Sequence, residues 1–188
     1  MRKLVLLFIF IAILAPMNLS AQTPFMVASQ NVITSKGEID PSMWTTMSKK
    51  YDGNIGFYAW FLAGKSWGEA LVGPAFFPAK WAEIDLAVGL ETDKNPQRFQ
   101  GQLWMGNDNS SFLTALEYGG SGFWFVAEGN RKVGSSGVGL GFRAQRFIGV
   151  GPRVEYVSGK SKFWVSPIMW DTEHKNATNS MFGLTFTP

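Results

Sequence analysis

The chain has 188 residues, of which 46% are hydrophobic, 15% are aromatic and only 16% are charged. Its net charge of +3 comes from 17 basic and 14 acidic residues, which is too balanced for a surface that binds nucleic acid. Cysteine is absent, and this excludes disulfides, thiolate metal sites and a lipid-modified N-terminal cysteine.

The first 21 residues have the layout of a secretory signal peptide. Arg2 and Lys3 form a basic start, and residues 4–15 are an unbroken apolar run that is shorter than the roughly 20 residues a membrane-spanning helix needs. Ala21 ends a plausible cleavage site, and an uncleaved anchor is the alternative. We therefore expect residues 1–21 to be removed on export. Cleavage would leave a nearly neutral mature chain, because Arg2 and Lys3 would be lost.

Residues 22–53 differ from the rest of the chain and predict a short helix. Asp40 is suited to cap it and Pro41 to occupy its first turn. Its apolar side would carry Met43, Trp44 and Met47. We expect this N-terminal segment to pack over one end of the following domain. An interfacial anchor or a plug is the alternative.

Residues 54–188 alternate with period two, which is typical of β-strands. Between residues 83 and 91, four apolar side chains alternate with acidic and small residues; the apolar set is Ile84, Leu86, Val88 and Leu90. Segments rich in Gly, Asn, Asp, Ser and Pro separate about ten such runs. Connections this short force neighbouring strands to pair antiparallel. The sequence therefore predicts an all-β fold, an antiparallel up-and-down β-barrel of about 8–10 strands.

The two strand faces differ in composition, and the polar face indicates which one lines the barrel. That face combines many glycines with the charged residues Glu83, Asp85, Glu117, Glu128, Arg143, Arg153 and Glu155. Small residues and opposite charges suit a narrow lumen, so we expect these seven to form an ion-pair network there, with the individual pairs left open. Acid–base machinery is the competing interpretation. The apolar face would then contact lipid, with Trp67, Trp81 and Trp170 near strand ends as an aromatic belt.

The signal peptide, the strand–turn pattern from Asn54 and the closing Phe182-x-Leu184-x-Phe186 strand resemble the small outer-membrane β-barrels of Gram-negative bacteria. The resemblance is one of architecture over residues 54–188 and includes no family-specific motif. It implies a bacterial outer-membrane location, with outer-membrane lipid and the barrel-assembly machinery as partners. In that class the machinery reads an aromatic residue at the end of the last strand. Here Phe186 is followed by Thr187 and Pro188.

Candidate chemistry is sparse. The one histidine, His174, lies in a polar turn beside Glu173, where it could act as a general base or a metal ligand. Metal centres need three or four converging ligands, so we expect a solvated loop residue. The sequence predicts no catalytic, cofactor-binding or metal-binding residues. The expected function is a non-enzymatic structural or surface-interaction barrel with a closed lumen, its protein partner left open. The alternatives are a soluble periplasmic lipocalin-like barrel that binds an apolar ligand and a lipid-modifying outer-membrane enzyme.

Overall fold

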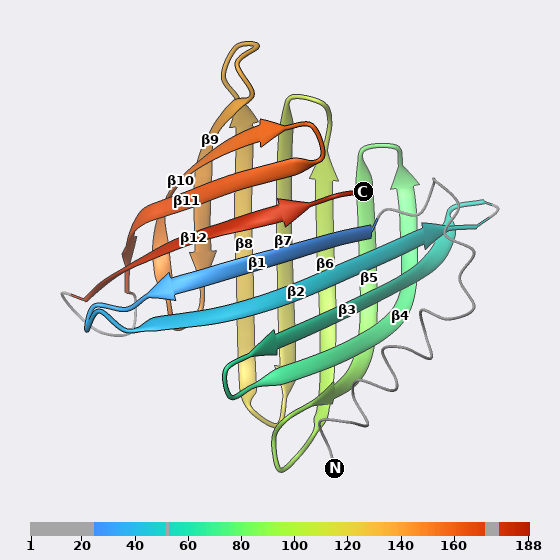
Figure 1. The fold of residues 1–188 in the computed structure, drawn as a ribbon. Helices are drawn as coiled ribbons and strands as arrows, with labels where there is room; N and C mark the ends of the chain where they lie inside the picture. Colours follow the sequence, from blue (N-terminus) through green and yellow to red (C-terminus); the bar gives the residue numbers. More distant parts are fainter. Residues whose placement is uncertain (1–24, 52, 172–176) are drawn as a thin grey trace.

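The structure, a computed structural model, describes residues 25–51, 53–171 and 177–188. These residues form twelve β-strands in one closed antiparallel barrel, in which each strand pairs with its neighbours in sequence and β12 pairs with β1 (Figure 1). No helix in this described part of the chain is long and apolar enough to cross a membrane. The expected signal peptide and His174 lie outside the described residues.

The strands are 8 to 12 residues long and short turns join them. In chain order they are β1 Phe25–Ile33, β2 Ile39–Lys50, β3 Ile55–Gly64, β4 Gly68–Ala79, β5 Ala82–Glu91, β6 Gln97–Gly106, β7 Ser110–Gly119, β8 Gly122–Lys132, β9 Val138–Gln145, β10 Gly149–Ser158, β11 Ser161–Trp170 and β12 Thr178–Phe186.

The prediction of a helix that begins at Asp40 is wrong, because this segment forms β2. Trp44 pairs with Ala28 of β1 on one side and with Leu62 of β3 on the other. The local capping pattern of Asp40 and Pro41 competes here with two complete backbone ladders, and the ladders prevail because tertiary pairing overrides propensity. The barrel therefore begins at Phe25 instead of Asn54, and the expected count of about 8–10 strands was too low.

The apolar face of the strands points outward and the polar face points into the lumen. On β5, Leu86 and Val88 are 54% and 55% exposed, whereas Asp85, which directly precedes Leu86, is completely buried. The same alternation exposes Phe182, Leu184 and Phe186 on β12. An apolar outer wall is the arrangement of a membrane barrel, and it does not favour the soluble lipocalin-like alternative, which needs an apolar interior.

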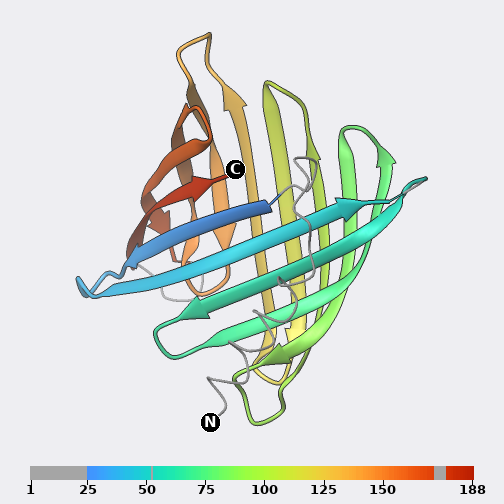
Figure 2. The ribbon, with the colours of Figure 1, turned by 45° about the vertical axis from the view of Figure 1, so that its right-hand side comes forward.

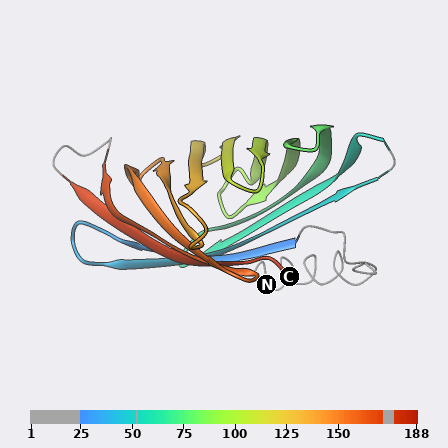
Figure 3. The same ribbon diagram turned by 90° about the horizontal axis from the view of Figure 1, so that it is seen from above.

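The barrel is uneven in shape. Strands β1 to β4 cross in front of β5 to β9 at a steep angle (Figures 1 and 2), and the ring of strands seen from above is drawn out in one direction (Figure 3). We call the end where β1 begins and β12 finishes the termini end, and the opposite end the distal end. The turns β4–β5, β6–β7 and β8–β9 belong to the termini end and lie at the top of Figure 1.

Candidate functional site: the lumen network

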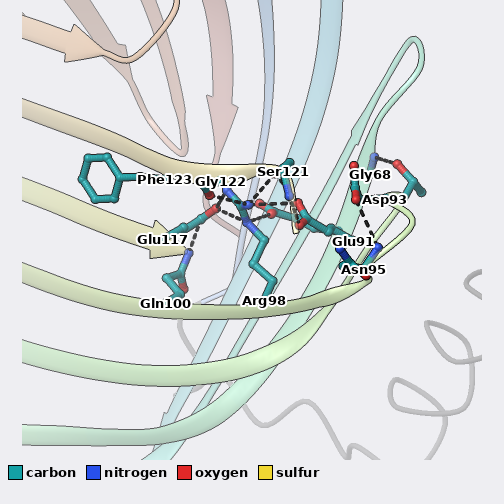
Figure 4. Close-up of polar contacts among 12 residues, drawn as sticks. Gly68, Glu91, Asp93, Asn95, Arg98, Gln100, Glu117, Ser121, Gly122 and Phe123 are labelled. Carbon is teal, nitrogen blue, oxygen red and sulfur yellow. Dashed lines mark hydrogen bonds and ion pairs between the residues drawn. The ribbon is translucent and has the colours of Figure 1, made fainter. Parts of the chain in front are cut away.

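An acidic cluster around Arg98 occupies the lumen near the distal end. The Arg98 guanidinium lies 2.9 Å from Glu69 Oε2, 2.9 Å from Glu91 Oε2 and 2.7 Å from Glu117 Oε2. It also donates a hydrogen bond of 2.8 Å to the Ser121 hydroxyl. Figure 4 shows the Arg98 side chain reaching between Glu117 and Glu91. One buried guanidinium is thus shared by three buried carboxyl groups.

The fold brings these groups together from β4, β5, β6 and β7. Gly119 pairs with Arg98 across the β6–β7 ladder, and a Cβ on Gly119 would lie 2.8 Å from a Glu91 carboxylate oxygen. Glycine therefore leaves the space that the carboxylate fills. The Trp67 ring lies 5.2 Å from the Arg98 guanidinium. This contact corrects the expectation that Trp67 belongs to the outer belt, while Trp81 and Trp170 are 57% and 55% exposed.

A separate hydrogen-bonded chain lies closer to the middle of the barrel. The Tyr58 hydroxyl donates to Gln102 Oε1 at 3.2 Å, and Gln102 Nε2 donates to Asp85 Oδ2 at 2.8 Å. Asp85 is therefore held by an amide. Tyr58 on β3 reaches Gln102 on β6 across two intervening strands, so this contact spans the lumen and does not follow the wall.

A second cluster, rich in arginine, lies on β8 to β11. Arg143 and Arg153 share the Glu128 carboxylate, with Arg153 Nη1 at 2.6 Å from its Oε2. Glu155 Oε2 lies 3.7 Å from Arg153 Nε and 3.6 Å from Lys162 Nζ. Three cations here face two carboxylates, which is the opposite balance to the cluster around Arg98.

The indole ring of Trp164 packs against both arginines of this second cluster. The guanidinium groups of Arg153 and Arg143 lie 4.3 Å and 5.2 Å from the centre of its ring. The ring itself lies over Gly183 of β12, where a Cβ would approach it to 2.5 Å. Glycine at position 183 therefore positions the indole, and the indole faces both arginines in a geometry that favours cation–π attraction.

The opposite walls of the barrel meet at mid-height. Arg143 Nη2 on β9 donates a 3.0 Å hydrogen bond to Gln30 Oε1 on β1, four places away in the strand order. Trp44 and Trp60 stack with their ring centroids 5.0 Å apart on one wall and face Trp124 on the other. The cavity between these walls has a volume of only about 20 Å³, close to the space of a single water molecule. Beyond this cavity, a vestibule of about 270 Å³ opens at the distal end.

The structure divides the seven residues expected in the lumen network between separate places. Arg143, Arg153, Glu128 and Glu155 lie together, whereas Glu117 belongs to the Arg98 cluster. Asp85 is held by Gln102, and Glu83 lies half-buried beyond it.

Sequence reasoning missed three members of the network, namely Arg98, Glu69 and Glu91. Their position in the alternation was a usable signal, because Arg98 lies two residues before Gln100 on the same face. Glu91 likewise shares a face with Glu83 and Asp85. Within the described residues, no group of three or more histidine and carboxylate side chains could hold a metal ion.

Comparison with known proteins identifies the fold. No family model matches the chain, and no curated protein matches it. Among solved structures it is similar to the KdgM porin (10% identity over 86% of this chain and 98% of that one, TM-score 0.52). It is also similar to the Acinetobacter baumannii outer membrane protein Omp33 (7% identity, 90% and 100%, TM-score 0.57). A third similar structure is the outer membrane phospholipase A from Escherichia coli (11% identity, 91% and 92%, TM-score 0.52).

Identities this low show a common fold and do not by themselves show a common activity. The named proteins include a porin and an enzyme, so the likeness does not decide between transport, catalysis and a structural role. The closed barrel and its apolar outer wall agree with the location that the fold implies. The chain has the architecture of the Gram-negative outer-membrane β-barrels and is a protein of the bacterial outer membrane.

Proposed function

We propose that the protein is a non-enzymatic outer-membrane barrel with a closed lumen, which acts in the envelope as a structural or surface-interaction protein. The observation that carries this proposal is the meeting of opposite walls at mid-height, where Gln30 accepts a hydrogen bond from Arg143 and the adjoining cavity is about 20 Å³. A barrel closed in this way leaves its two ends and its outer wall as working surfaces.

The burial of the lumen charges supports the same proposal. Arg98, Arg143 and Arg153 are 1%, 4% and 3% exposed. The charges that line a water-filled pore are wetted by the water that passes them, as in the large porins. Here the guanidinium groups are instead surrounded by carboxylates, amides and indole rings, so their hydrogen bonds are made within the protein.

Conductance in planar lipid bilayers tests the closed lumen. We expect the purified wild-type protein to insert without stable ion-conducting steps. The double variant Trp44→Gly, Trp124→Gly should open a path, because it removes one indole from each of the facing walls. The matched control is Trp81→Gly, Trp170→Gly, which removes two outward-facing indoles and should stay silent. Steady conductance by the wild-type protein would overturn the proposal.

A further inference from the structure

The turns at the termini end carry an excess of exposed cations. Five basic side chains, which we call the cationic rim, are exposed there: Lys50, Lys80, Arg131, Lys132 and Lys160. Lys80 and Lys160 lie in the turns β4–β5 and β10–β11, Lys50 ends β2, and Arg131 and Lys132 end β8, so the five are spread around the barrel and not gathered on one side. None of the five makes an ion pair within the described residues.

Acidic residues do not neutralise this rim. Asp108 is the exposed acid of the described turns at this end, Glu83 is half-buried on the lumen face, and Asp52 lies outside the described residues. The distal end is balanced by comparison. Its solvent-accessible charged residues in the described turns and strand ends are Lys36, Lys65, Lys94 and Arg146 against Glu38, Asp40, Asp93 and Asp171. The positive field is therefore a property of one end of the barrel.

Large exposed apolar side chains accompany the rim cations. Tyr51 follows Lys50 and is 57% exposed, and Trp81 follows Lys80 and is also 57% exposed. Val133 follows Lys132 in the same way and is 49% exposed. Amphipathic rings settle at the boundary between hydrocarbon and headgroups, and a lysine beside such a ring lies at the level of the lipid phosphates. This pairing of residues fits a membrane surface better than it fits a soluble polyanion.

We propose that the cationic rim binds the headgroups of anionic phospholipids in the leaflet that surrounds the termini end. Each ammonium or guanidinium group would lie close to a lipid phosphate and enrich anionic lipid around the barrel. Such attraction adds up over neighbouring cations and decays within a Debye length, about 10 Å at 0.1 M salt. Because the distal end is balanced, the enrichment is confined to one leaflet.

Spin-label electron paramagnetic resonance tests this binding directly. The protein is reconstituted in phosphatidylcholine vesicles that contain a trace of spin-labelled phosphatidylglycerol or spin-labelled phosphatidylcholine. At low salt, we expect the fraction of label immobilised by the wild-type barrel to be about twofold or more higher for phosphatidylglycerol than for phosphatidylcholine. This preference should disappear in 1 M salt. Equal immobilisation of the two labels by the wild-type protein would overturn the proposal. That result is also the one expected if the rim binds an acidic protein and no lipid.

Two matched triple variants locate the effect. Lys80→Gln, Lys132→Gln, Lys160→Gln removes three rim cations, and Lys36→Gln, Lys65→Gln, Lys94→Gln removes three distal ones. The first variant should lose most of the preference and the second should keep it, with gel mobility before and after heating used to show that both are folded. Equal preference in the two variants would overturn the assignment to the rim.

Discussion

Two buried arginines differ in what their removal would leave behind. Arg98 is the one guanidinium beside Glu69, Glu91 and Glu117, whereas Arg153 shares Glu128 with Arg143. The loss of Arg98 would leave three carboxylates without their cation in a buried place. The loss of Arg153 would leave Glu128 still paired with Arg143. A second cation therefore remains for the carboxylate at Arg153 and none remains at Arg98, although both arginines are almost completely buried.

We expect Arg98→Met to lower the free energy of unfolding more than Arg153→Met, and both to exceed Lys160→Met. Breaking a buried pair typically costs about 3–5 kcal/mol, and Arg98→Met should reach that range. Arg153→Met should cost less because Arg143 remains, and Lys160→Met should have no measurable effect because Lys160 is solvated. Urea unfolding in zwitterionic micelles provides the measurement. Equal losses for Arg153→Met and Lys160→Met would mean that Arg153 is hydrated and the lumen is open.

At the scale of the strand, β5 shows how one sequence serves two environments. Its outward residues Ile84, Leu86, Val88 and Leu90 are exposed, while Asp85, Ala87 and Glu91 are buried in the lumen. Proline interrupts this regularity elsewhere. The register shifts between Phe76 and Ala79 on β4 and between Ser166 and Met169 on β11 enclose Pro78 and Pro167. A proline cannot donate to the ladder, so these bulges bend the wall where the barrel curves.

The substitution Leu86→Arg tests the outward face of β5. Leu86 lies near the middle of the strand, and an arginine at mid-membrane on the lipid face should lower stability by about 2–4 kcal/mol. Trp81→Arg, in the turn just before the strand, should cost about 1 kcal/mol or less, because the charge reaches the headgroups. Reversible unfolding in lipid vesicles distinguishes the two. Similar costs at both positions would contradict a lipid-facing Leu86.

At the scale of the molecule, closure depends on the ladder between β1 and β12. This ladder joins Val27 to Phe186 and continues to Ile33 opposite Ser180. Without it the barrel would expose the backbone donors and acceptors of two edge strands to lipid, where each unsatisfied group costs several kcal/mol. Closure also sets the distance across the lumen, and so the contact between Gln30 on β1 and Arg143 on β9.

Deletion of residues 178–188 should therefore abolish the folded barrel, although β11 ends before them. Removal of Pro188 alone should be tolerated, because the paired residues of β12 end at Phe186. The measurement is the shift in gel mobility between unheated and heated samples after refolding in detergent. A chain without β12 that still showed this shift would mean that β1 and β11 can close the barrel by themselves.

The sequence by itself determined the class of the fold and the assignment of faces. Period-two alternation is a local property, so the lipid face of Leu86 and the lumen face of Asp85 could be derived before any strand was paired. Tertiary structure decided whatever depends on two strands meeting. Asp40 and Pro41 resemble a helix start, yet their segment became β2 because β1 and β3 supplied ladders on both sides.

The sequence also could not predict which charged residues pair with one another in the lumen. Arg98 reaches Glu69 over an intervening strand, and Arg143 reaches Gln30 across the lumen, so these partners follow from register and closure. Neither the strand register nor the closure of the barrel can be derived from the spacing of residues along the chain, because both depend on how distant strands pair.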